Sequence, residues 1–239
     1  MKKILITTCA RGGSKGIPGK NIKELNGIPL IAYTIKTGFE FAKAHNADFG
    51  LSTDSDEIRQ VAAAYGLISE YQRPEVLATD TAGKIGAIRD IMEFEEKKNQ
   101  CTYDYVIDMD VTSPLRNVED LESALKILKN NPDALNIFSV SPANRNPYFN
   151  MVEQGDDGFV HVVKGSEKIK SRQQAPVVYD MNASFYIFRR EFFNEGHTIS
   201  TTSRSLAYVV PHICFDLDEP FDFTVMEIII RENLLDFSL

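Results

Sequence analysis

KILITTCARGGSKGIPGKN, residues 3–21, joins an apolar run to a loop that is rich in glycine and in basic residues. The run at residues 3–9 predicts a first strand, because turn-forming residues follow it directly. Similar apolar runs then alternate along the chain with segments of helical periodicity. This alternation predicts an α/β fold in which helices cover a mostly parallel sheet.

The remaining elements follow from periodicity and from turn residues. Expected strands cover residues 49–53, 66–70, 103–109, 135–139, 184–188 and 206–210, and expected helices cover 29–44, 55–65, 81–92, 118–129 and 220–235. Ser55 and Thr81 are residue types that cap helices, so we expect them at the starts of the second and third helices. The last helix is apolar around most of its circumference, which predicts that it is buried.

Residues 140–180 differ in character from the rest of the chain. A Gly-Asp-Asp-Gly sequence at 155–158 precedes Phe-Val-His-Val-Val at 159–163, a pattern typical of a β-hairpin. We therefore expect residues 1–239 to form a single domain that carries 140–180 as a small β-rich excursion. Such an excursion would serve in dimer contact or as a lid over the substrate.

The composition narrows the class of protein. The 239 residues are 43% hydrophobic and 25% charged, which is ordinary for a globular chain. The net charge of -8 argues against a dedicated binder of nucleic acid or anionic membrane, because both partners require cationic surface. No apolar stretch reaches the roughly 18 to 20 residues that span a bilayer, and no signal-peptide pattern opens the sequence. We expect a cytoplasmic protein whose three separated cysteines stay reduced.

The first loop reverses the charge of the chain. Residues 2–23 contain six cations and no acid. Glycines let backbone N–H groups approach a polyanion, and Arg11, Lys15 and Lys20 can neutralise the oxygens of a triphosphate. The loop matches neither the Walker spacing nor the G-x-G-x-x-G pattern of dinucleotide sites. We interpret it as a phosphate-binding loop of another kind, with a solvated basic loop as the alternative.

Six ordered blocks of sequence carry a resemblance to one family. They are Arg11 with 13–15, 18 and 20–21, STDS at 52–55, Arg73-Pro74 with LATDTA at 77–82, TSPLR at 112–116, Arg172-Gln173, and FDLD at 215–218. In these blocks the chain resembles the CMP-sialic-acid (acylneuraminate) synthetases. The resemblance implies a Rossmann-like, three-layer nucleotidyltransferase fold. It also implies transfer of CMP from CTP to the anomeric hydroxyl of an acidic nine-carbon 2-keto sugar, with release of pyrophosphate.

The same resemblance implies roles for individual residues. The nucleotide would be bound by Arg11, Gly13, Ser14, Lys15, Lys20, Asn21, Arg73 and Thr81, and the sugar by Ser113, Arg172, Gln173 and Asn182. Asp110, which is assigned from its place at a strand end, would also bind the sugar. Arg11 and Lys20 would stabilise charge on the α-phosphate and the leaving pyrophosphate. Arg172 would take the sugar carboxylate. The proton of the sugar hydroxyl would go to Asp216 or to a metal-bound water, and a homodimer would be the working form.

One departure from the family concerns the strand end before TSPLR. Sialic-acid members usually carry Gln-Pro there, whereas this chain has Asp-Met-Asp-Val at 108–111. Together with NPYFN at 146–150 and YDMNAS at 179–184, this looks more like the branch that acts on legionaminic acid. Three alternatives stay open: a cytidylyltransferase for another sugar such as KDO, a non-catalytic nucleotide-binding protein, and a GT-A-type glycosyltransferase.

Two pairs of carboxylates are candidates for the site. We expect Asp108 and Asp110, at a strand end, to point to opposite faces, and we favour Asp110 because it lies nearer the carboxyl edge. Either could instead cap the following turn. Asp216 and Asp218 would diverge on a regular strand, but at a strand-to-helix turn both can reach one Mg²⁺. The alternative is that Asp218 and Glu219 lie at the N-terminus of the final helix and stabilise it by interacting with the helix dipole. The four histidines show no metal spacing and are expected to be structural.

Overall fold

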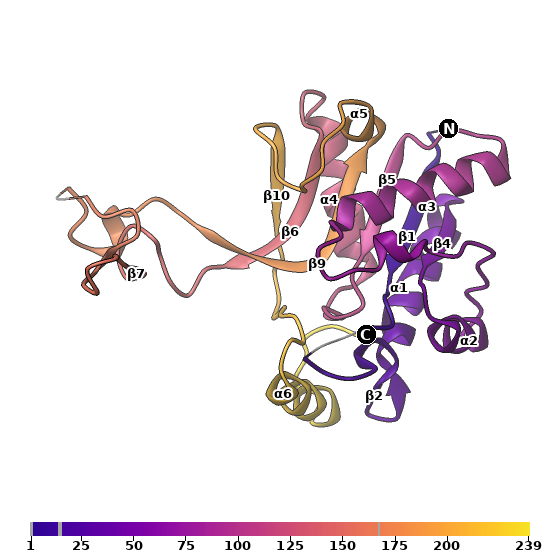
Figure 1. The fold of residues 1–239 in the computed structure, drawn as a ribbon, viewed down its shortest axis with the longest axis horizontal. Coiled ribbons are helices and arrows are strands. Elements are labelled where there is room, and N and C mark those ends of the chain that lie inside the picture. The colour runs from indigo at the N-terminus through magenta and orange to yellow at the C-terminus, as the bar shows by residue number, and fades with distance from the viewer. Residues whose placement is uncertain (1, 14–15, 167) are drawn as a thin grey trace. The chain divides into compact units, whose positions relative to one another are not determined.

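The structure is a computed structural model that describes residues 2–13, 16–166 and 168–239. Its main sheet has six strands in the order β10-β6-β9-β5-β1-β4 (Figure 1). They are β1 (Ile4–Cys9), β4 (Asp48–Ser52), β5 (Tyr105–Met109), β6 (Asn136–Pro142), β9 (Tyr179–Arg189) and β10 (Ser205–Val209). β1 is parallel to both β4 and β5, while β9 is antiparallel to β5. The chain is thus an α/β protein with a mostly parallel central sheet.

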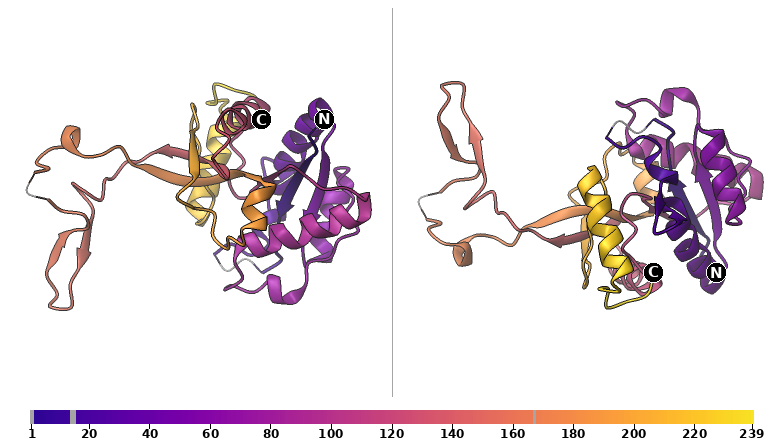
Figure 2. Two further views of the ribbon diagram at one scale, coloured as in Figure 1. Left: turned by 90° about the horizontal axis from the view of Figure 1, so that it is seen from above. Right: turned by 90° about the horizontal axis from the view of Figure 1, so that it is seen from below.

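Helices cover both faces of this sheet (Figure 2). They are α1 (Leu30–His45), α2 (Asp56–Ala64), α3 (Lys84–Asn99), α4 (Val118–Asn130), α5 (Arg190–Asn194) and α6 (Pro220–Arg231). α1 and α4 pack on one face, where Ile107 and Met109 of β5 meet Leu121 and Leu125. α3 and α5 pack on the other, around Val106. Alternate residues of β5 therefore enter different cores, as strand geometry requires.

Short elements complete the chain. They are the 3-10 turns η1 (Lys20–Ile22), η2 (Glu75–Leu77) and η3 (Arg172–Gln174), and the two small antiparallel pairs β2 (Glu24–Leu25) with β3 (Ile28–Pro29) and β7 (Val152–Gln154) with β8 (Val160–Val162). Gly158 in the β7–β8 turn has φ of 83°, a backbone that glycine adopts without strain. The hairpin predicted around residues 155–158 is confirmed.

The chain divides into two compact units. The larger contains residues 1–139 and 182–239, and the smaller contains residues 140–181. The larger holds the main core. The smaller consists of β7, β8, η3 and connecting segments together with the ends of β6 and β9, and many of its apolar side chains are exposed.

Most predicted elements are present, and three expectations were wrong. Residues 66–70 form no strand: the Ser69 hydroxyl donates to the carbonyl of Leu51 (3.0 Å), where a strand would place a backbone N–H. Thr81 does not cap the third helix, because a turn closed by Ala82 N–H on the Thr79 carbonyl (3.2 Å) delays the helix, whose N-cap is Gly83. The last helix is buried along one stripe only, and Phe221 is 72% exposed.

Candidate functional site

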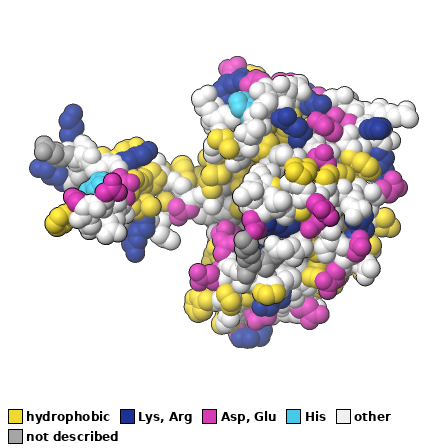
Figure 3. All heavy atoms as spheres, in the orientation of Figure 1, with side chains coloured by type: hydrophobic (Ala, Val, Ile, Leu, Met, Phe, Trp, Pro, Cys, Tyr) yellow, Lys and Arg dark blue, Asp and Glu magenta, His cyan; other side chains and the backbone are white. Residues whose placement is uncertain are grey.

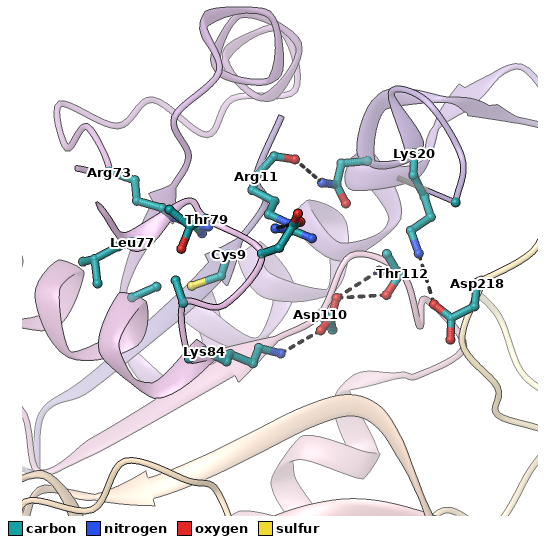
Figure 4. A pocket seen from close by; sticks show the side chains of 16 residues that line it. Cys9, Arg11, Lys20, Arg73, Leu77, Thr79, Lys84, Asp110, Thr112 and Asp218 are labelled. Carbon is teal, nitrogen blue, oxygen red and sulfur yellow. Dashed lines mark hydrogen bonds and ion pairs between the residues drawn. The ribbon is translucent and has the colours of Figure 1, made fainter. Parts of the chain in front are cut away.

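A cavity of about 420 Å³ opens where β1 and β5 end (Figure 4). Because these strands are parallel, their carboxyl ends meet at one edge of the sheet, which is where open α/β sheets bind ligands. The predicted site residues that line the cavity are Arg11, Lys20, Asn21, Arg73, Asp110 and Asp218. The fold therefore brings together side chains that lie as far apart in sequence as residues 11 and 218.

The first loop supplies the basic side of the cavity. Arg11 Nη1 lies 2.8 Å from Asp80 Oδ1, and Lys20 Nζ lies 3.2 Å from Asp218 Oδ1. The carbonyl of Arg11 accepts a hydrogen bond from Asn21 Nδ2 (2.9 Å), which fixes the loop internally. Both cations are thus already paired with partly or fully exposed carboxylates. A phosphate that replaced those carboxylates would keep the charges balanced.

Glycines make up much of the rest of the predicted loop. Gly13 is exposed in this loop, and Ser14 and Lys15 lie outside the described residues. Gly16 approaches the far end of the chain closely, since a Cβ there would come within 2.9 Å of the Asp218 carbonyl oxygen. Lys20 Nζ also donates to the carbonyl of Leu217 (2.6 Å). The absence of a side chain at position 16 lets the loop pack against the 217–218 segment.

Lys84 and Asp110 line the cavity, and the Lys84 ammonium also contacts the buried Asp108 behind them. Lys84 Nζ lies 2.7 Å from Asp110 Oδ2 and 3.0 Å from Asp108 Oδ2. The expectation that the two aspartates point to opposite faces was wrong, because side chains two residues apart on a strand share a face. Thr112 donates to Asp110 Oδ1 from its N–H (3.2 Å) and its hydroxyl (3.1 Å). Asp110 thus also binds the following turn, as its alternative interpretation held.

Burial and neighbouring charges have opposite effects on the pKa values of Lys84 and Asp110. Burial alone would raise the pKa of Asp110, but the Lys84 ammonium and the Thr112 donors lower it. Burial would likewise lower the pKa of Lys84, yet Asp108 and Asp110 raise it well above its usual value. Burial and the nearby Asp108 raise the pKa of the Cys9 thiol, which also lines the cavity. Lys84 and Asp110 therefore favour each other's charged form, whereas the surroundings of Cys9 favour its neutral thiol.

Of the two predicted nucleotide-binding residues in the 73–82 block, Arg73 and Thr81, only Arg73 lines the cavity. Arg73 lines the cavity, but its guanidinium is buried and donates to Ser52 Oγ (2.9 Å) and to the Ser52 carbonyl (2.7 Å). Thr81 does not line the cavity, whereas Thr79 and Ala82 do. The wall is built by the turn that contains Thr81 rather than by its side chain.

Three acidic side chains are close enough to influence one another. Burial raises the pKa of Asp216, and the neighbouring Asp218 and Asp110 raise it further. Within the described ranges, no group of three or more His, Cys, Asp or Glu is arranged to hold a metal by itself. Hard carboxylate oxygens crowded in this way do fit Mg²⁺, which takes one or two carboxylates and completes its shell with water and phosphate oxygens. The Asp218–Glu219 alternative also has support, because Glu219 is the N-cap of α6.

Among the predicted sugar-binding residues of the larger unit, Asp110 lines the cavity, whereas Ser113 and Asn182 do not. Ser113 and Asn182 are buried in the larger unit, where Ser113 Oγ donates to the Phe215 carbonyl (3.4 Å) and Asn182 Oδ1 accepts from Ser184 N–H (3.3 Å). Arg172 and Gln173 belong to η3 of the smaller unit, where Arg172 Nη2 donates to the Asn144 carbonyl (3.4 Å). Their roles at the sugar stay predictions.

Sequence reasoning missed two residues that organise the site. The sequence patterns predict no role for Lys84. The signal that could have found it is its position directly after the LATDTAG segment at a helix start, where a cation is unfavourable. Arg116 ends the TSPLR block and is only 1% exposed. Its guanidinium donates to the carbonyls of Asp110 (2.7 Å), Ser113 (2.6 Å) and Ser184 (2.7 Å), and burial lowers its pKa to about 10. It ties the turn after β5 to β9.

Comparison with known proteins shows the family of the chain. The family model described as cytidylyltransferase matches residues 5–227. The chain belongs to the cytidylyltransferase family. This cytidylyltransferase is 38% identical to the post-translational flagellin modification protein B of Campylobacter coli, over 98% of both chains. It is 37% identical to the CMP-N,N'-diacetyllegionaminic acid synthase of Campylobacter jejuni, over 96% of both.

Solved structures support the fold of this cytidylyltransferase. The CMP:2-keto-3-deoxy-manno-octonic acid synthetase complexed with CTP matches 97% of this chain and 100% of its own, with a TM-score of 0.66 and 16% identity. The predicted nucleotidyltransferase fold is therefore confirmed. In the described part of the chain, no helix is both long enough and apolar enough to cross a membrane.

Proposed function

We propose that this cytidylyltransferase transfers CMP from CTP to the anomeric hydroxyl of an acidic nine-carbon 2-keto sugar, releasing pyrophosphate. Legionaminic acid is the preferred member of that class. One observation carries the proposal: a cavity at the carboxyl edge of the sheet is lined by the cations Arg11 and Lys20 together with the carboxylates Asp110 and Asp218. Relatives that match nearly the whole chain include a CMP-N,N'-diacetyllegionaminic acid synthase.

The basic side of the cavity would bind the triphosphate. Arg11 and Lys20 would exchange Asp80 and Asp218 for phosphate oxygens, and Lys20 would stabilise charge that develops on the α-phosphate and the leaving pyrophosphate. Lys15, Ser14 and Gly13 would add contacts from the same loop. The chain's contribution is positioning and charge stabilisation, because transfer of this type requires little covalent chemistry from side chains.

The acidic side would hold Mg²⁺ and the acceptor. Asp216 and Asp218 would be the protein ligands of the ion, which when bound would neutralise phosphate charge. Asp110 would face the acceptor sugar, and Asp216 is a candidate to take the proton of its hydroxyl. The crowding of Asp216 with Asp218 and Asp110 supports this division of roles.

The smaller unit supports a homodimer. Residues Val152, Phe159, Val160 and Val177 are each more than half exposed, and apolar surface of this kind favours contact with another protein. A second copy would cover it, and Arg172 would contribute to binding the sugar carboxylate. On the larger unit, basic and acidic side chains are intermixed over the visible face (Figure 3), which fits small substrates rather than nucleic acid. A cytoplasmic location is part of this proposal.

Release of pyrophosphate tests the proposal. The purified protein would be incubated with Mg²⁺ and CTP, UTP or ATP, each with legionaminic, sialic, pseudaminic acid or KDO. We expect release with CTP and a nine-carbon acid, fastest with a legionaminic acid. Release only with KDO would overturn the substrate class. Binding of CTP without release with any sugar would indicate a non-catalytic nucleotide-binding protein instead.

A further inference from the structure

Lys84 occupies an unusual position for a lysine. It is the first residue of α3, and the helix has no side-chain cap and no acid in its first turn. A cation at a helix N-terminus is opposed by the helix dipole. The same helix also carries Lys98 near its C-terminal end, where the dipole favours it and where it lies 3.8 Å from both Glu70 and Glu95. Lys84 is therefore placed where helix stability alone would not put it.

The surroundings of Lys84 account for this position. Its ammonium lies 4.7 Å from the centre of the Tyr186 ring and contacts both Asp108 and Asp110. Asp108 is fully buried, and its Oδ1 accepts from the Thr7 hydroxyl (2.9 Å). The contact of Asp108 Oδ2 with the ammonium is an ion pair without hydrogen-bond geometry. Of the two carboxylates, it is Asp110 that accepts a hydrogen bond from the Lys84 ammonium.

Asp110 is held at both oxygens. Lys84 binds Oδ2 and Thr112 binds Oδ1, while Arg116 holds the backbone carbonyl of the same residue (2.7 Å). Thr112 and Arg116 are only two and six residues away, so they hold the turn that Asp110 itself begins. Among these hydrogen bonds to the Asp110 carboxylate, the one from Lys84 comes from a different element, α3, and it joins that helix to the end of β5.

We propose that Lys84 is a positioning residue, which acts on the transfer by holding the Asp110 carboxylate in one orientation at the cavity. The inference rests on the proposed function for its catalytic consequence. Without the ammonium, Asp110 Oδ2 would lose its hydrogen bond from α3, and Asp110 would turn away from the acceptor. A displacement of about 1 Å at a reacting group can cost about 100-fold in rate.

The test combines a double-mutant cycle with crystal structures. The variants are Lys84→Met, Asp110→Asn, their combination, and Lys98→Met as a matched control on the same helix. We expect Lys84→Met to lower kcat by about 10- to 100-fold with KM for CTP within about twofold. The combined variant should lose no more than the worse single variant, because both changes remove one function. Lys98→Met should match the wild type.

A second variant protects the test against a folding defect. Lys84→Met with Asp108→Asn removes the ammonium and one buried charge together, so that no like-charged pair is left. We expect the same loss of kcat, with Asp110 in a changed or divided orientation in the crystal. Wild-type kcat in this variant, additive losses in the cycle, or an unchanged Asp110 orientation would each overturn the inference. If the wild type itself shows no turnover, the proposed function fails, and the Asp110 orientation still decides whether Lys84 holds it.

Discussion

The first loop and the end of β5 use ion pairs in opposite ways. In the loop, Arg11 is 35% exposed and its partner Asp80 is 44% exposed, while Asp218, the partner of Lys20, is 71% exposed. At the end of β5, Lys84 meets Asp108, which is fully buried, and Asp110, which is 22% exposed. Exposed pairs are worth about 0–1 kcal/mol and exchange easily, whereas breaking a buried pair costs about 3–5 kcal/mol. The comparison separates groups that can release their partners for a substrate from groups that keep an active site in place.

The largest effect is expected in the loop at Lys20. Lys20→Ala should lower kcat/KM for CTP by about 100- to 1,000-fold, because the ammonium would stabilise charge that develops during transfer. Its melting temperature should fall only modestly, since the variant loses the Asp218 contact and the hydrogen bond to the Leu217 carbonyl, each of which adds on the order of 1 kcal/mol. Steady-state pyrophosphate release and thermal unfolding measure the two quantities. Near wild-type turnover would contradict the assignment, and Lys23→Ala, which removes a cation of the same segment outside the cavity lining, is the control.

A buried pair away from the cavity extends the comparison. His212 Nε2 lies 2.9 Å from Asp120 Oδ2, and Tyr208 donates to the other oxygen of Asp120 (3.0 Å). Burial alone would lower the pKa of His212, but Asp120, with a smaller contribution from Asp236, raises it above 6.5. Its stabilisation should be complete below about pH 6.5 and lost as the pH rises through the folded-state pKa.

The variant His212→Gln isolates that effect. At pH 6 it should lower the free energy of unfolding by about 1.5–3 kcal/mol, the contribution of a hydrogen bond to a charged group. The gap between wild type and variant should narrow at pH 8.5, when His212 is closer to neutral. Urea unfolding at both pH values measures it. A gap that is constant with pH would show that packing against Phe237 rather than charge stabilises this contact.

These pairs also show how far the sequence could predict the site. Local patterns located the first loop, the hairpin turn at 155–158 and the Ser55 cap, whose side chain accepts from Ile58 N–H (3.3 Å), because each depends on a few adjacent residues. The Lys84 contacts with Asp108 and Asp110 join separate elements and follow only from packing of α3 on β5. Buried and exposed residues alternate over 66–70 as in a strand, yet the Ser69 hydroxyl, rather than a backbone N–H, donates to the Leu51 carbonyl. Tertiary contacts of this kind have no signal in periodicity.

The acid beside Lys20 offers an intermediate effect. Asp218→Asn should raise the Mg²⁺ concentration needed for half-maximal rate by about 10-fold, because one of two proposed hard ligands loses its charge. A titration of rate against Mg²⁺ at saturating CTP measures it. Glu227→Gln removes an acid of the following helix α6 outside the cavity lining and should leave the requirement unchanged. An identical Mg²⁺ requirement in Asp218→Asn and wild type would remove Asp218 from the proposed ligands.

The smallest effect is expected at Asp80, and it has the opposite sign. If phosphate must replace Asp80 at Arg11, then Asp80→Asn removes a competitor and should tighten CTP binding, by up to about fivefold for a pair worth at most about 1 kcal/mol. Calorimetry at low and high salt measures the affinity, and the gain should shrink at high salt because this pair is exposed. Weaker binding in Asp80→Asn would show that Asp80 orients Arg11 for the nucleotide instead of competing with it. The loop would then be preorganised in the way that the end of β5 is, and the contrast between the two regions would disappear.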